Sequence, residues 1–388
     1  MTMTGRETIV PEVREADVLR IAATRASATE QLGHLHPEVI DALVQAGTFR
    51  RWVSAEVGEG ASVTDVLGTI ERISQADGAT GWCVMIANTT ALISHRLPAE
   101  WATTIFGDPA ACSGGFGMPA GAARVVDGGL VVTGRWAWGS GTDHCTWVGG
   151  GVRVVDENGE STKTLDGART PFVFFEPGDV ELLDTWHVAG LKGTASTDYS
   201  VDAVFVPEGR WAQLIGVDPR VDDALGRFPF FGALASGVAA VMIGLAQRAI
   251  DELVLLGAKR SMGSKKTLAE RAPVQADLSL ARANVAQARS YLYGTTDRVW
   301  EDGNHGRDVG DDVRAELRLA ATSASRRCLE AVSLCYHAAG GAAVYETSPL
   351  QRVFRDAHVA QSHGMVAPRT MEPLGRFAFG LETNTALF

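Results

Sequence analysis

The sequence predicts an α+β protein in which a helical part, a β-rich part and a second helical part follow one another along the chain. Apolar residues recur with helical spacing up to about residue 107, short β-branched runs fill residues 108–212, and helical spacing returns over residues 213–388. A chain of 388 residues, 46% hydrophobic and 21% charged, is long enough for two or three packed units. We therefore expect three domains, 1–107, 108–212 and 213–388, that pack as one compact subunit.

The helical pattern of the first domain runs over residues 10–106. Ser62 is the expected N-cap of a helix whose buried face carries apolar residues three and four positions apart, namely Val63, Val66, Leu67, Ile70 and Ile73. After a break at Asp77-Gly78, the uncharged residues 80–92 predict a helix that is buried on all sides. No residue in this first third stands out as catalytic.

One corner of the second domain gathers residues that suit a flat ligand. Residues 134–145 (GRWAWGSGTDHC) place two tryptophans, a serine and a histidine among glycines. They follow a predicted strand at 130–133, entered through the turn Asp127-Gly128-Gly129, and a second strand resumes at 146–148. Planar rings on a flexible backbone favour a planar ligand, whereas a β-corner whose tryptophans only fill the core is the alternative.

Further β-branched runs predict strands at 123–126, 172–175 and 203–206. Residues 115–120 match the GxGxxA pattern of dinucleotide-binding proteins. Strand pattern follows this match where that motif requires a helix. A Rossmann site is therefore not expected.

The third domain reads as a bundle of long helices. A long helix is predicted over 311–339, and it ends at Gly340-Gly341. Another helix is predicted to begin at Ser348-Pro349, where the sequence has an S-x-x-Q capping box. The uncharged run 228–247 is long enough to span a membrane, but it opens on proline and is rich in Gly and Ala, which favours a packed helix. A further long helix is predicted between these segments. It has one apolar face with spacings of three and four, formed by Leu278, Ala281, Val285, Ala288 and Leu292.

Composition excludes several classes of protein. A net charge of -11 argues against a nucleic-acid partner, because such binding depends on Lys and Arg neutralising phosphates. His358 and His363 are five residues apart and lack the spacing of a zinc helix, so no metal site is expected. Without a signal peptide at the N-terminus or a convincing membrane segment, we expect a cytoplasmic protein. Five scattered cysteines form neither a CxxC pair nor a zinc pattern and should be reduced, mostly buried thiols: Cys83, Cys112, Cys145, Cys328 and Cys335.

Three segments, 134–141, 184–210 and 351–363, resemble the acyl-CoA dehydrogenase superfamily, most of all its two-component (group D) flavin monooxygenases. The resemblance implies an N-terminal helical domain, a middle β-barrel or sandwich, a C-terminal four-helix bundle and a homotetramer. It also implies reduced FMN or FAD supplied by a separate NAD(P)H:flavin reductase, with molecular oxygen as co-substrate. The implied reaction oxygenates a small aromatic or heteroaromatic substrate through a flavin C4a-hydroperoxide.

The resemblance places Trp138 and Ser140 against the flavin ring, near N5 and O4. Ser140 is then one of two expected catalytic residues, although a turn serine bonded to backbone is the alternative reading. His187, in the second flavin-side corner, is expected to be a core histidine. The resemblance implies cofactor contacts at Ser113, Phe116, Met118, Trp138, Gly139, Ser140, Gly193, Thr194, Ser196, Gly340 and Gly341.

The segment after Arg355-Asp356-Ala357 distinguishes oxygenases from dehydrogenases. The resemblance puts the dehydrogenases' catalytic glutamate at Gly364, where the base is missing, and the monooxygenases' histidine at His363, the second expected catalytic residue. Arg352, Arg355 and Asp356 read as an arginine–carboxylate set that locks two helices. An acyl-CoA dehydrogenase or oxidase, and a flavin-free binding or structural homologue, remain the competing functions.

Overall fold

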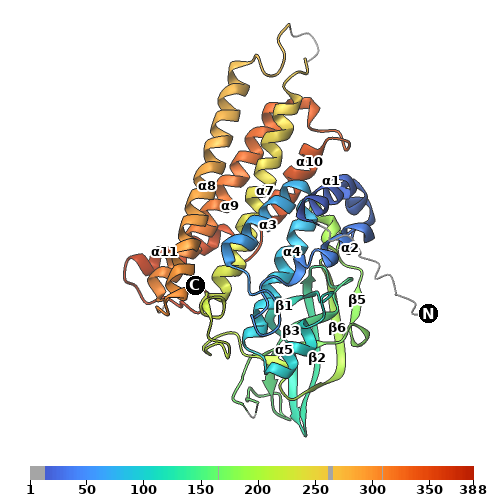
Figure 1. Ribbon diagram of the computed structural model, residues 1–388, viewed down its shortest axis with the longest axis vertical. Coiled ribbons are helices and arrows are strands. Elements are labelled where there is room, and N and C mark those ends of the chain that lie inside the picture. The colour runs from blue at the N-terminus through green and yellow to red at the C-terminus, as the bar shows by residue number, and fades with distance from the viewer. Residues whose placement is uncertain (1–13, 165, 261–264, 308) are drawn as a thin grey trace, which may run out of the picture.

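The computed structural model describes residues 14–388 except 165, 261–264 and 308, and it confirms the order of helices, sheet and helices (Figure 1). The part of the helical prediction over residues 10–13 lies outside the described residues. The N-terminal helices are α1 (Glu15–Leu32), α2 (Pro37–Gln45), α3 (Val63–Ala76), α4 (Gly78–Ala91) and α5 (Ala99–Phe106). The C-terminal helices are α6 (Ala224–Arg227), α7 (Phe230–Leu256), α8 (Ala272–Asn304), α9 (Asp311–Ala339), α10 (Pro349–Gln361) and α11 (Met371–Ala378). In Figure 1 the sheet lies at the lower end, α7, α8 and α9 extend upward, and α1 to α4 lie beside both parts.

The predicted caps and breaks of the first domain are confirmed. The Ser62 hydroxyl accepts a hydrogen bond from the backbone N–H of Asp65 and caps α3. Asp77 ends α3 and caps α4, because its carboxylate accepts from the Thr80 N–H at 2.9 Å. Every residue of α4 except Ile86 is buried, as the uncharged sequence predicted.

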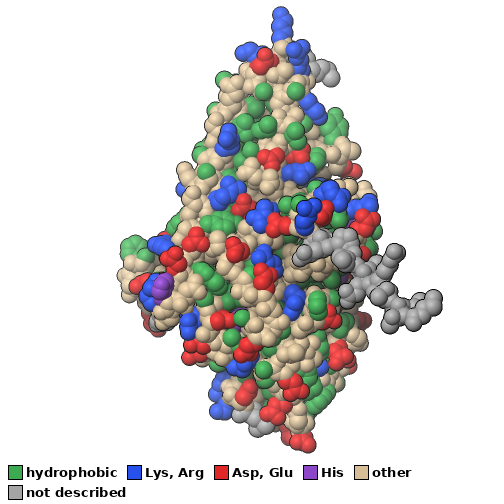
Figure 2. Space-filling model, viewed as in Figure 1, with side chains coloured by type: hydrophobic (Ala, Val, Ile, Leu, Met, Phe, Trp, Pro, Cys, Tyr) green, Lys and Arg blue, Asp and Glu red, His purple; other side chains and the backbone are tan. Residues whose placement is uncertain are grey.

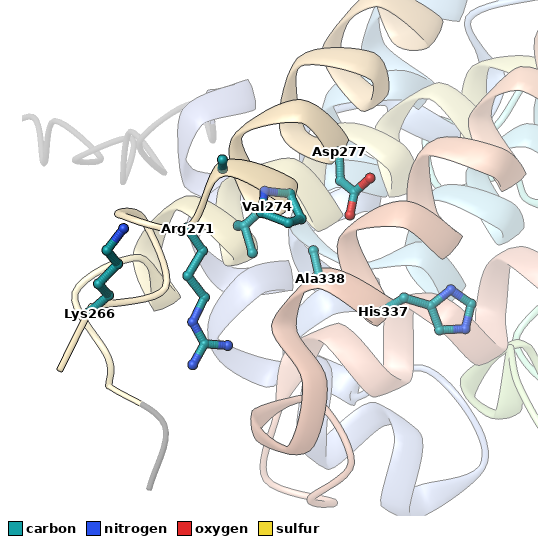
Figure 3. A pocket seen from close by; sticks show the side chains of 8 residues that line it. Lys266, Arg271, Val274, Asp277, His337 and Ala338 are labelled. Carbon is teal, nitrogen blue, oxygen red and sulfur yellow. The ribbon is translucent and has the colours of Figure 1, made fainter. Parts of the chain in front are cut away.

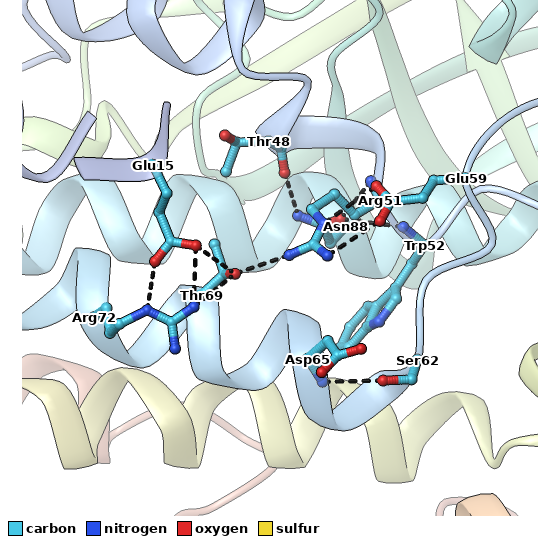
Figure 4. A network of polar contacts seen from close by, with 10 residues as sticks. All are labelled: Glu15, Thr48, Arg51, Trp52, Glu59, Ser62, Asp65, Thr69, Arg72 and Asn88. Carbon is cyan, nitrogen blue, oxygen red and sulfur yellow. Dashed lines mark hydrogen bonds and ion pairs between the residues drawn. The ribbon is translucent and has the colours of Figure 1, made fainter. Parts of the chain in front are cut away.

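A buried amide fixes α4 to the loop before α3 (Figure 4). Asn88 accepts hydrogen bonds from the backbone N–H groups of Arg51 and Trp52, at 2.9 and 3.2 Å. Its Nδ2 donates to the carbonyls of Thr48 and Val84, both at 2.9 Å. Asn88 is fully buried, so these four bonds replace the water that its amide would otherwise bind.

The middle domain is one seven-stranded sheet with the strand order β5-β6-β2-β1-β3-β4-β7. All neighbouring strands are antiparallel except β1 and β3. The predicted turn at residues 127–129 joins β1 to β2 through a left-handed Gly128. The strands are β1 (Ser113–Val126), β2 (Gly129–Gly139), β3 (Trp147–Val155), β4 (Phe172–Phe175), β5 (Glu181–Leu183), β6 (Thr197–Pro207) and β7 (Trp211–Ala212).

The GxGxxA match lies inside strand β1, which agrees with the exclusion of a Rossmann site. Gly115 has a φ of +144°, and a Cβ there would meet the carbonyl oxygen of Gly149 at 1.9 Å. Glycine is therefore required for the close approach of β1 to β3. The register of this pair shifts twice between Phe116 and Gly121, which bends the strand.

The C-terminal helices form the expected bundle. α7 meets the length and composition test for a membrane span, yet 78% of its most apolar window is buried inside the protein. It packs against α3, α8, α9 and α10, so its apolar surface is covered by other helices. On the face in Figure 2, basic and acidic side chains are interspersed.

One predicted cap is wrong. The Ser348 side chain makes no capping hydrogen bond to α10. Gln351, the other half of the expected box, uses its amide elsewhere: its oxygen accepts from Arg355 Nε at 2.7 Å and its nitrogen donates to the Glu346 carbonyl. The helix still begins at Pro349, the preferred first-turn residue.

Candidate active site

Ser140 lies at the predicted corner, directly after β2, and is buried. Its Oγ accepts a hydrogen bond from Trp82 Nε1 at 3.0 Å and lies 2.6 Å from Ser196 Oγ. Ser196 Oγ lies 2.6 Å from Thr194 Oγ1, and the Thr194 hydroxyl donates to the Leu191 carbonyl at 2.8 Å. Three hydroxyls thus form a continuous hydrogen-bonded chain, which we call the hydroxyl chain.

The two ends of the hydroxyl chain determine its direction. A hydroxyl has one proton to donate, and the Thr194 proton goes to the Leu191 carbonyl, which can only accept. Thr194 Oγ1 must therefore accept from Ser196, and Ser196 Oγ must accept from Ser140. Ser140 donates to Ser196 and accepts from Trp82, so one lone pair of its Oγ is left.

Backbone strain surrounds the hydroxyl chain. Among the described residues other than glycine, four have a positive φ, and three of them lie here: Trp138 at 59°, Leu191 at 52° and Ala195 at 44°. Such conformations cost about 1 to 3 kcal/mol each and persist only where surrounding contacts enforce them. A bulge between β2 and β6 accompanies the strain at Trp138.

Trp82 connects the two expected catalytic residues. Its indole N–H donates to Ser140, and its ring meets the His363 imidazole edge-on, with centroids 5.5 Å apart and planes at 75°. Trp82 comes from α4, Ser140 from the sheet, and His363 from the segment after α10. The structure therefore brings Ser140 and His363 together from opposite parts of the sequence.

The neutral tautomer of His363 follows from its backbone contact. His363 Nδ1 accepts from the Met365 N–H at 3.3 Å, so the neutral ring carries its proton on Nε2. The Met365 carbonyl accepts from Arg318 Nη2 at 2.8 Å, which anchors the backbone on the other side of the same residue. Burial lowers the pKa of His363 to about 4, and the positive charge of Arg318 adds to this effect. His363 is neutral at pH 7 and can donate from Nε2.

Aromatic side chains form an open face beside Ser140. The Trp138 side chain is exposed, and its ring contacts Phe116 edge-on, with centroids 5.5 Å apart. Met118, further along β1, is also exposed. The Ser113 hydroxyl is buried without a hydrogen-bond partner among the described residues. One exposed ring, Trp138, and one half-buried ring, Phe116, suit a planar heteroaromatic group.

Three glycines expected at the cofactor divide into two groups: Gly193 directly precedes Thr194 of the hydroxyl chain but packs against α1, and Gly340 and Gly341 lie after α9. A Cβ on Gly193 would meet Thr29 Cγ2 at 2.3 Å, so this glycine allows α1 to pack closely. Gly340 and Gly341 are exposed after α9, at the end of the bundle where Ala338 and Lys266 line one hollow. A Cβ at either of these two glycines would meet no atom of the described residues within 4 Å.

The prediction that His187 is a core histidine is wrong. Its side chain is exposed, and Nε2 lies 3.4 Å from the Asp184 carboxylate. The segment after β5 runs over the surface, so the His187 ring has no core around it. His358 is exposed as well, and no group of His, Cys, Asp or Glu in the described chain could hold a metal ion.

Arg355 and Asp356 of α10 bind different partners and join three parts of the protein, and the ion pair of Arg355 with Glu30 locks α10 to α1 as expected. Arg355 pairs with Glu30 of α1 at 2.5 Å and donates to the Ala189 carbonyl. Asp356 is buried and accepts from the Leu191 N–H at 2.6 Å. Burial raises the pKa of Asp356 to about 7, and the charge of nearby Asp77 adds to this effect. Asp356 therefore positions the loop in which the hydroxyl chain ends.

Asp356→Asn is expected to change how stability depends on pH. The folded-state pKa exceeds its ordinary value of 3.8, so the stability linked to protonated Asp356 is complete below about pH 4 and is lost as the pH rises through about 7. The variant should gain on the order of 1 to 4 kcal/mol relative to wild type across this window. Urea unfolding at several pH values measures the difference, with exposed Asp202→Asn as the control for losing one charge. Parallel curves for Asp356→Asn and wild type would contradict the expectation.

The hollow lined by Lys266 and Ala338, at the far end of the bundle, is drawn in Figure 3. It has a volume of about 520 Å³ and is open to the surface. Figure 3 shows Lys266 and Arg271 on one side and Asp277 and His337 on the other. It contains none of the residues predicted for the site.

Three residues at the site escaped sequence reasoning. Trp82 lies in a helix that reads as uniformly buried, and its indole N–H gave the only signal, since a buried indole N–H needs an acceptor. Arg318 is buried in α9 without a carboxylate partner among the described residues, and Met365 acts through its backbone. No residue type or spacing could have pointed to Met365.

Comparison with known proteins agrees with this geometry. Residues 236–368 match the family model "Acyl-CoA dehydrogenase, C-terminal domain". The chain is 32% identical over 350 residues to indole-3-acetate monooxygenase of Pseudomonas putida, covering 89% of this chain and 88% of that one. It is 27% identical to the oxygenase subunit HsaA, a flavin-dependent monooxygenase of Mycobacterium tuberculosis, over 97% of this chain and 94% of that one. The crystal structure of XiaF from Streptomyces sp., in complex with FADH2 and glycerol, superposes with a TM-score of 0.86, at 23% identity over 95% of this chain and 96% of that one.

The arrangement of helices and sheet, together with these similarities, shows that the chain has the acyl-CoA dehydrogenase fold. Within that class, the chain belongs to the flavin-dependent monooxygenases. It is the oxygenase component of a two-component system, which takes reduced flavin from a separate reductase and acts on a small molecule.

Proposed function

We propose that this oxygenase acts on a small aromatic or heteroaromatic substrate, with Ser140 and His363 as its catalytic residues. The observation that carries the proposal is that Trp82 contacts both residues beside an exposed aromatic face. When bound, reduced FMN or FAD supplies the two electrons with which one atom of O₂ enters the substrate and the other leaves as water.

The aromatic face would hold the flavin ring. Trp138 and Phe116 offer ring surfaces and Met118 an apolar edge. The Ser113 hydroxyl is buried and unpaired among the described residues, so it would reach the ring only after a local rearrangement. Gly139 and Ser140 would contact the ring edge, with Thr194 and Ser196 acting through Ser140. Aromatic walls exclude water, which favours transfer of oxygen to the substrate over release of hydrogen peroxide.

His363 would hold the substrate on the same side as Trp82. Its Nε2 has no hydrogen-bond partner among the described residues and does not belong to the fully buried unpaired atoms, so it can reach a ligand. The neutral imidazole would donate from Nε2 to a substrate oxygen or nitrogen. Gly364 offers no carboxylate for the proton abstraction that a dehydrogenase requires.

Three organisational features belong to the same proposal. The boundaries 1–107, 108–212 and 213–388 fall between α5 and β1 and between β7 and α6. The subunit would form a homotetramer, in which Gly340 and Gly341 could reach a flavin held by another subunit, and the enzyme would be cytoplasmic. Light scattering of the purified protein tests the tetramer.

The test of function mixes the protein with chemically reduced FMN or FAD, oxygen, and a panel of indole-3-acetate, indole and phenol. We expect an oxygenated product from at least one aromatic compound, and none when reduced flavin is left out. Reduction of the bound oxidised flavin by an acyl-CoA alone would show a dehydrogenase or oxidase instead. Failure to bind either form of flavin would show a flavin-free homologue.

Ser140→Ala is expected to leave the fold intact and to increase hydrogen peroxide release in the absence of substrate. Loss of one ring-edge hydrogen bond, worth roughly 0.5 to 1.5 kcal/mol, corresponds to about a two- to tenfold faster release. Peroxide is measured after rapid mixing with reduced flavin and oxygen. The control is Ser236→Ala, which removes from α7 a buried hydroxyl that has no hydrogen-bond partner in the described part of the chain. Equal rates in wild type and Ser140→Ala, with equal flavin affinity, would return Ser140 to the role of a turn residue.

A further inference from the structure

The hydroxyl chain has a property that the proposed function does not require. Ser140 has no proton left for a ligand, because its proton is committed to Ser196 and the chain ends at a carbonyl. Its remaining lone pair can only accept. A ligand atom that meets Ser140 Oγ must therefore bring its own proton.

The two redox forms of flavin differ at this point. N5 of the ring carries a proton in reduced flavin and a lone pair in oxidised flavin. An acceptor at the N5 edge forms a hydrogen bond with the reduced form and repels the lone pair of the oxidised form. We propose that Thr194 and Ser196, by fixing Ser140 as an acceptor, select reduced over oxidised flavin. This inference rests on the proposed function, which places Ser140 at the ring edge.

The surroundings of the chain hold its direction. Three donors share the Leu191 carbonyl, and the Thr194 hydroxyl is the nearest at 2.8 Å, whereas the Thr194 N–H and Trp186 Nε1 both lie 3.1 Å away. The Leu191 N–H donates to Asp356. The strained backbone of Leu191 precedes Thr194 and Ser196 in the chain, and the strained backbone of Ala195 lies between them. Because both the carbonyl and the N–H of Leu191 are hydrogen-bonded, its backbone cannot rotate, and the carbonyl stays in place as the terminal acceptor of the hydroxyl chain.

Thr194→Val tests the direction directly, because valine keeps the shape and removes the hydroxyl. Ser196 then loses its acceptor and can donate to Ser140, which frees the Ser140 proton for the flavin. Ser196→Ala frees the same proton by removing the acceptor itself. Both variants should bind oxidised flavin better relative to reduced flavin, lowering the ratio of the two dissociation constants by about two- to tenfold.

Two matched variants keep the direction of the chain. Thr194→Ser retains the hydroxyl and should retain the wild-type ratio. Trp82→Phe removes the donor at the other end, but the chain is still directed by the Leu191 carbonyl, so its preference for reduced flavin should persist. A residue that only stabilised the fold would not separate Thr194→Val from Thr194→Ser in this way.

The measurement is the dissociation constant of oxidised FMN and of FMN reduced under anaerobic conditions, for each folded variant, repeated with FAD. Tighter binding of reduced flavin by wild type, and a fall in this preference in Thr194→Val and Ser196→Ala alone, supports the inference. An unchanged ratio in these two variants overturns it while leaving the proposed function standing. A wild-type protein that binds no reduced flavin overturns both.

Discussion

His363→Ala should lower formation of the oxygenated product by roughly a hundredfold or more, the scale of a positioned acid–base or hydrogen-bonding group. Oxygen should still be consumed with reduced flavin, but hydrogen peroxide should replace the product, because the substrate is no longer held at Nε2. The measurement is product formed per oxygen consumed, together with a melting curve.

His363→Gln is the matched variant for this prediction. The amide N–H of glutamine can donate near the position of Nε2, so this variant should keep a larger share of coupling than His363→Ala. If His363 only fills space, alanine should instead lower stability by about 1 to 3 kcal/mol and leave coupling per folded enzyme intact. That result would remove His363 from the active site.

Asn88→Ala should produce the largest loss of stability among the substitutions considered, about 3 kcal/mol or more. The change leaves the buried N–H groups of Arg51 and Trp52 and the Thr48 carbonyl without their partner. It also releases α4, which carries Trp82, from the loop before α3. Urea unfolding followed by intrinsic fluorescence measures the loss.

Asn284→Ala is a suitable control, because Asn284 is also a buried asparagine in a helix. Its Oδ1 accepts one long bond from Arg327 at 3.4 Å, and its Nδ2 has no partner among the described residues. We expect a loss of about 1 kcal/mol from this change. Equal losses for Asn88→Ala and Asn284→Ala would show that the four bonds of Asn88 do not set the stability of this region.

The fold could be predicted where a local rule and the tertiary packing agree. The face that begins at Val63, the uncharged residues of α4 and the break at Gly340 each carry a periodic or conformational signal of their own. The predictions for Ser348 and His187 were wrong because both depend on tertiary surroundings that a local pattern does not contain. Arg355 binds the oxygen of Gln351, the other half of the expected Ser348 capping box, and no described element covers His187.

For the candidate site, individual residues could be predicted from the sequence, but their arrangement in space could not. The resemblance supplied Ser140 and His363, but their meeting at Trp82 depends on how three parts of the chain pack. The direction of the hydroxyl chain depends on the Leu191 carbonyl, which every residue type would provide. Backbone groups leave no signal in a pattern of side chains. The direction of the hydroxyl chain and the tautomer of His363 therefore follow only from the three-dimensional structure.

Because of the position of Trp82, catalytic turnover also reports whether the three parts of the protein are packed together. One indole ring contacts the sheet through Ser140 and the C-terminal segment through His363, while its own helix belongs to the N-terminal domain. Separation of the N-terminal helices, the sheet or the C-terminal helices from the other two would dismantle the proposed site, even if each part kept its secondary structure. Catalysis should therefore disappear at lower denaturant concentrations than helix content, and no single domain of this enzyme could be grafted elsewhere with its chemistry intact.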